Sequence, residues 1–178
     1  MVWTVDDATR MQQLLDMGVD SITSNYPERL NNLVAAMGYA RWASDPGQEL
    51  SSYDRDFAAD PEGDGNSNGI EHVLGVLPTV PQFHALTELD APAPGVLVFH
   101  HTLSNMLGFD VAYGYEWSTD LQHWDPIGTP NSAGDSVAVE AVVVVDRLAP
   151  LPDDVRVTAT ITGESTPNLF VRLFARKE

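Results

Sequence analysis

The chain has 178 residues, no cysteine, and a formal net charge of −17 from 26 acidic and 9 basic side chains. Phosphate-binding surfaces need clustered Lys or Arg, so this balance excludes nucleic acid and anionic membranes as partners, and the lack of cysteine excludes disulfides and thiolate metal sites. No stretch approaches the roughly 20 apolar residues that span a bilayer. Residues 1–7 lack the basic start and apolar run of a signal peptide, so for an exported protein we expect the signal outside this chain.

The first 38 residues have the pattern of two strand–helix units of a parallel α/β sheet. The expected elements are a strand over 2–5, a helix over 7–17 with Asp6 as N-cap, a strand over 19–23, and a helix that Pro27 opens and Gly38 ends. Gly18 stands at the end of the first helix, where a left-handed residue is needed.

Two segments of this region, VWTV at residues 2–5 and GVDSITSNYP at 18–27, resemble the carboxy-terminal end of glycerophosphodiester phosphodiesterases. That family closes its (β/α)8 barrel with strands of this kind. The resemblance covers about the first 37 residues, and three positions depart from the pattern. Ser21 stands where glycine is usual, Ser24 where aspartate is usual, and Asp6 where asparagine is usual.

The resemblance implies an enzyme that hydrolyses glycerophosphodiesters to glycerol 3-phosphate and an alcohol, with a divalent metal and histidine acid/base catalysis. The family's catalytic residues lie in earlier strands, and a complete barrel takes about 250 residues. We therefore expect this chain alone to be inactive and not to bind the catalytic metal. Trp3 is the one position that carries over, as a residue near the substrate pocket, although a core aromatic would read the same way.

Residues 60–71, here called the acidic loop, have the ligand spacing of an EF-hand- or dockerin-like calcium loop. Glycine at the sixth position, Gly65, permits the sharp bend that wraps the chain around an ion. The predicted Ca²⁺ ligands are Asp60, Glu62, Asp64, the Asn66 backbone carbonyl, Asn68 and Glu71. The alternative for such a composition is a polar surface turn.

The segment around the acidic loop is expected to be helical in places. Short helices are predicted over 39–42, 49–57 and 69–77, with a break at 45–47 and Pro78 as the end of the last helix. His72 is interpreted as a surface residue of that last helix and not as a metal ligand.

From residue 79 onward, apolar residues alternate with period two, as in half-buried antiparallel strands. Segments at 95–101, 109–117, 137–145, 155–162 and 169–175 give about five or six strands, separated by turn sequences. A small β-sandwich fits this pattern best. His100 and His101 are adjacent, so on a strand they point to opposite faces and cannot share one metal ion.

The acidic loop and the stretches 115–124 and 170–173 also resemble a linker and terminal domain of exported bacterial proteins. That resemblance implies an accessory or anchoring module located extracellularly or in the cell envelope, with a glycan or cell-surface target open for the sandwich.

The predicted fold is thus α+β in three parts: a barrel remnant at 1–38, a helical linker with the calcium loop at 39–78, and an antiparallel β-sandwich at 79–178. Two functions stay open. The chain is either the inactive tail of a phosphodiesterase, whose barrel lies upstream, or a calcium-stabilised binding or surface-attachment module without enzymatic activity.

Overall fold

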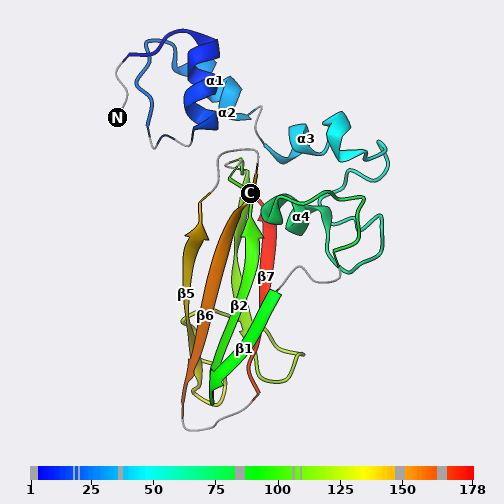
Figure 1. The fold of residues 1–178 in the computed structure, drawn as a ribbon, viewed down its shortest axis with the longest axis vertical. Coiled ribbons are helices and arrows are strands. Elements are labelled where there is room, and N and C mark those ends of the chain that lie inside the picture. Colours follow the sequence, from blue (N-terminus) through cyan, green and yellow to red (C-terminus); the bar gives the residue numbers. More distant parts are fainter. Residues whose placement is uncertain are drawn as a thin grey trace.

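The computed structural model describes residues 4–17, 19, 21–35, 38–82, 87–105, 107–108, 110–146, 151–163 and 168–178. The fold is α+β: short helices come first in the chain and antiparallel sheets follow (Figure 1). Trp3, Gly18 and Phe109 lie outside the described residues. No described helix is long and apolar enough to cross a bilayer.

The amino-terminal region is a helix pair, α1 (Ala8–Asp16) and α2 (Pro27–Ala35). The predicted cap of the first helix is wrong by one residue, because Asp7 accepts the Arg10 N–H at 2.8 Å. Asp6 instead accepts from the Ser24 hydroxyl and from the Asn25 N–H at 3.1 and 2.9 Å, which ties the two segments together.

The predicted strand over 19–23 is present only as an isolated bridge residue, Ile22. Next to it, the Val5 N–H donates to the Thr23 carbonyl at 2.8 Å. The two segments that resemble the barrel end therefore lie side by side at this point.

The linker contains α3 (Tyr39–Trp42), a 3₁₀ turn (Pro46–Gln48) and α4 (Asn68–Leu74). The helix predicted over 49–57 is wrong: the described backbone there forms turns, and Tyr53 is 93% exposed instead of lying on an apolar face. The helix predicted over 69–77 ends early. Gly75 takes the left-handed conformation (φ +69°) after Leu74 and stops the helix three residues before Pro78.

The rest of the chain forms two antiparallel sheets, in the orders β1-β2-β6-β5 and β4-β3-β7. The strands of the first sheet are β1 (Thr87–Ala93), β2 (Val96–Leu103), β5 (Ser136–Val145) and β6 (Asp153–Thr162). Those of the second are β3 (Val111–Ser118), β4 (Asp125–Pro126) and β7 (Phe170–Lys177). Each of the five predicted strand segments overlaps one of these strands.

The sheets share an apolar core, an arrangement consistent with a β-sandwich. Trp117 of one sheet is fully buried with Val137 and Ala159 of the other. The two strands that the sequence did not reveal have physical reasons to be missed. β1 carries Pro92, which a strand tolerates at a sheet edge, and β4 has only two residues.

A second apolar cluster joins the linker to the top of the sandwich. Tyr39, Ala43, Leu50 and Val73 pack together with Val111 of β3. Two hydrogen bonds add to this contact, from the Ser104 N–H to the Val73 carbonyl at 2.7 Å and from the Thr102 hydroxyl to the Leu74 carbonyl at 2.6 Å. The acidic loop and α4 are therefore held against the sandwich (Figure 1).

Candidate metal centre

The acidic loop curls around the side chain of Asp60. One carboxylate oxygen accepts the N–H groups of Gly63 and Asp64 at 2.8 and 3.2 Å, and the other accepts the Gly65 N–H at 2.9 Å. Gly63 and Gly65 have φ values of +75° and +95°. A side chain at either position would strain this backbone, so the two glycines allow the tight bend.

The bend gathers the carboxylates. Ligand oxygens of Asp60, Glu62 and Asp64 all lie within 4.8 Å of one another. Glu71, three residues into α4, is fully buried and lies within hydrogen-bonding reach of Glu62. Residues from the loop and from the helix thus converge at one place.

No hydrogen-bond donor of the described residues serves Glu62 or Glu71. All four of their carboxylate oxygens are buried without a partner. Exposed acidic clusters are common and mean little, but a buried carboxylate with no donor costs several kcal/mol or takes up a proton (~2–7 kcal/mol for a neutral polar group alone). A hard cation bound by these oxygens would remove that cost.

The electrostatics of Glu71 are consistent with a cation site. Burial, and then the neighbouring carboxylates of Glu62, Asp64 and Asp60, raise the pKa of Glu71 to about 9. At neutral pH its carboxyl group therefore retains a proton unless a cation displaces it. Asp64 differs: burial raises its pKa, but the N–H groups of Gln82 and Asn66 outweigh burial and lower the pKa below its ordinary value.

The two predicted asparagine ligands also connect the loop to its surroundings. The Asn68 amide nitrogen donates to the carbonyls of Asp54 and Asp56 at 2.7 and 2.8 Å, while its Oδ1 is buried without a donor. The Asn66 amide nitrogen donates to the Gln82 carbonyl at 3.3 Å. The structure thus brings together the four carboxylates, and ligation by the Asn66 carbonyl and Asn68 stays a prediction.

His72 is buried, so its interpretation as a surface residue is wrong. It is 1% exposed and lies between Trp42 and Tyr39, with ring centroids 4.7 and 5.8 Å away. Burial lowers its pKa to about 4. The sequence held a signal for this: Glu71, Val73 and Leu74 around it are also buried, because α4 is enclosed on most sides.

Gln82 is a contact that the sequence reasoning missed. Its N–H donates to the Asp64 carboxylate, while its carbonyl accepts from Asn66. No sequence spacing could reveal this pair, because it joins residues 16 and 18 positions apart through the turn that leads to β1.

The remaining polar side chains do not assemble a catalytic set within the described residues. His101 is buried and contacts Tyr115 and Thr102, which agrees with the prediction that His100 and His101 face opposite ways. Ser118, Asp120 and His123 lie close together, but both Ser118 and His123 bond Asp120 and not each other. Ser118 is buried and also accepts backbone N–H groups, which is the geometry of a turn.

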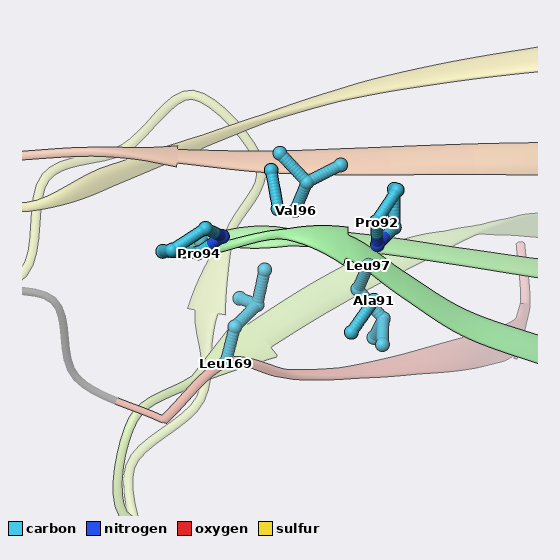
Figure 2. Close-up of a pocket in the computed structure, with 8 residues that line it drawn as sticks. Ala91, Pro92, Pro94, Val96, Leu97 and Leu169 are labelled. Atoms are coloured by element: carbon cyan, nitrogen blue, oxygen red, sulfur yellow. The ribbon is translucent and has the colours of Figure 1, made fainter.

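A hollow of about 440 Å³ lies at the β1–β2 hairpin, at the opposite end of the sandwich from α4 (Figures 1 and 2). Figure 2 shows its apolar lining, which includes Pro92, Pro94, Leu97 and Leu169. None of its lining side chains can titrate, so the hollow offers no acid, base or nucleophile.

Comparisons with known proteins identify no relative: no family model, curated protein or solved structure matches the chain significantly.

Proposed function

We propose that the chain is a calcium-stabilised module that binds or attaches and does not catalyse. The observation that supports this is the fully buried Glu71, without a donor, beside the carboxylates of Asp60, Glu62 and Asp64. A bound Ca²⁺ would be structural, because the acidic loop joins the helical linker to the sandwich and no catalytic groups approach it among the described residues.

The proposal includes a location outside the cytoplasm. Calcium loops of extracellular modules bind at about 10⁻⁴–10⁻³ M, which suits surroundings where calcium is plentiful. The proposed target of the sandwich is a glycan or another cell-surface component. Pulldown of cell-wall and glycan fractions with the full chain, with and without calcium, tests this part, and retention no greater than that of an unrelated acidic protein would reject it.

Thermal unfolding tests the calcium site. A ligand bound only by the folded state raises the thermal midpoint as its concentration increases. We expect millimolar Ca²⁺ to raise the midpoint of the wild type and of Glu140→Gln, an exposed control, while Glu71→Gln loses most of the shift. An undiminished shift in Glu71→Gln would show that the ligand assignment is wrong.

The second candidate is the tail of a glycerophosphodiester phosphodiesterase. The side-by-side placement of the resembling segments, linked by the Val5–Thr23 hydrogen bond, favours it. Under this proposal the barrel, the catalytic metal and the substrate pocket beside Trp3 belong to a longer protein. Two tests apply: the purified chain should not hydrolyse glycerophosphocholine, and the sequence upstream should encode barrel strands within about 200 codons.

A further inference from the structure

The carboxyl-terminal part of β5 is apolar and exposed on both faces. Val142, Val143, Val144 and Val145 are 42–48% exposed, although they belong to a regular strand. β5 pairs with β6 and lies at the edge of its sheet (Figure 1). Alternate backbone N–H and C=O groups of such an edge strand point outward and can pair with another strand.

The other long edge strands carry the residues that normally prevent such pairing. β1 contains Glu88, Asp90 and Pro92, and β7 contains Arg172, Arg176 and Lys177. Charges and proline of this kind block edge-to-edge association. In β5, residues 141–145 have neither, and the nearest charges are Glu140 and Asp146 at the two ends.

The strand also keeps an extended geometry to its end. Its register with β6 is regular through Val143, shifts once, and resumes at Val145 opposite Asp154. Unlike the two-residue β4, β5 thus offers a long edge at which a further strand can add.

Charge selects the occupant. The chain carries a net charge of −17, so most pairings of two copies would place carboxylates against carboxylates. Residues 141–145 are uncharged, and antiparallel pairing of this segment with itself places small apolar side chains opposite one another. A register centred on Val142 also keeps Glu140 and Asp146 away from each other, since it sets Glu140 opposite Val144 and Asp146 opposite Ala138. A twofold contact of this type is closed and stops at two copies.

We propose that two copies of this chain associate through residues 141–145 of β5, joining their four-stranded sheets into one continuous sheet. Five residues from each copy bury much less than the roughly 1,200 Å² of a standard interface, so the dimer is weak and depends on concentration. The two acidic molecules repel one another, and salt screens that repulsion. Association therefore strengthens as NaCl increases, whereas a contact held by ion pairs would weaken. This inference does not depend on the calcium site.

Sedimentation equilibrium of the full chain tests the proposal at concentrations up to about 1 mM, in low and high NaCl, with and without calcium. We expect a monomer–dimer equilibrium that tightens with salt in both calcium conditions. Val143→Lys and, separately, Val142→Lys should weaken it by about tenfold or more, because a lysine at the edge guards it.

Leu89→Lys is the matched control, since Leu89 is a 69% exposed apolar residue on the opposite edge of the same sheet. It should leave the dimer unchanged, and thermal unfolding of each variant confirms its folding. The proposal is overturned by a chain that stays monomeric throughout, by open-ended assembly beyond two copies, or by equal weakening in Leu89→Lys.

Discussion

Glu71 is the residue at which sequence spacing and structural environment meet. Its position at the twelfth place of the acidic loop marks it as a closing ligand, and its complete burial beside Glu62 makes an unbalanced charge there costly. A surface turn, the alternative for this composition, would leave its last carboxylate in water. The burial of Glu71 is therefore the main argument against that alternative.

Gly69 is a second residue whose role emerges from contacts. A Cβ at this position would overlap the Phe57 ring, and the Gly69 N–H donates to the Phe57 carbonyl at 2.9 Å. Gly→Ala in an exposed helix normally stabilises by about 0.5–1 kcal/mol. Here we expect Gly69→Ala to destabilise by about 1–3 kcal/mol, because the core cannot accept the extra methyl group.

Urea unfolding at a fixed calcium concentration measures this effect. In the double variant Gly69→Ala with Phe57→Ala, the clash is gone, so the loss should be smaller than the sum of the two single losses. Additive losses would mean that Phe57 does not set the requirement for glycine.

Tyr115 and His101 form a buried pair between the sheets. The His101 Nδ1 lies 2.7 Å from the Thr102 carbonyl and must donate to it, so Nε2 accepts from the Tyr115 hydroxyl, also at 2.7 Å. Tyr115→Phe leaves Nε2 without a partner and should cost about 1–3 kcal/mol.

Tyr113→Phe is the control for Tyr115, since Tyr113 lies on the same strand, is 40% exposed and makes no hydrogen bond through its hydroxyl with the described residues. Its unfolding free energy should change by no more than about 0.5 kcal/mol. If both variants lose the same stability in denaturant unfolding, the His101–Tyr115 bond contributes nothing specific.

At the scale of elements, the acidic loop and α4 form one unit whose stability should respond to pH. Without calcium, Glu71 has a pKa of about 9 in the folded chain against an ordinary value of 4.5. The folded state thus holds a proton that the unfolded state has released between these values. Its contribution to stability is fully present below pH 4.5 and is lost as the pH rises through 9.

We therefore expect the free energy of unfolding in chelator to fall from pH 7 to pH 9, a range above the pKa of neutral histidines. Ca²⁺ binds the deprotonated carboxylate, so its stabilising effect should grow over the same range. Glu71→Gln has no such proton and should show a flatter profile. An identical pH profile for the variant and the wild type would contradict the pKa argument.

Local elements with a clear period could be predicted from the sequence, whereas elements decided by tertiary contacts could not. The alternation in 137–145 and 155–162 locates β5 and β6 correctly, because half-buried strands require it. The spacing of Leu50, Tyr53 and Phe57 suggested a helix, yet Leu50 and Phe57 are used by a turn that packs on Tyr39 and Gly69. For the metal centre, ligand spacing identified the carboxylates but not their burial or the contact with Gln82.

At the scale of the whole molecule, the acidic loop lies at the junction of the chain's parts. Asp64 and Asn66 hold Gln82 before β1, Asn68 holds the segment before the loop, and α4 bonds the end of β2. A cation that fixes the loop would therefore order the linker and the sandwich together. This makes a structural role for calcium the central claim about the molecule.

Isothermal titration of the full chain with Ca²⁺ tests that claim most directly. We predict saturable binding of one Ca²⁺ per chain with a Kd of about 10⁻⁴–10⁻³ M, retained by Glu140→Gln and lost by Glu71→Gln. Binding that does not saturate, or that persists unchanged in Glu71→Gln, would contradict the account, because it would show only diffuse attraction of cations to an acidic surface.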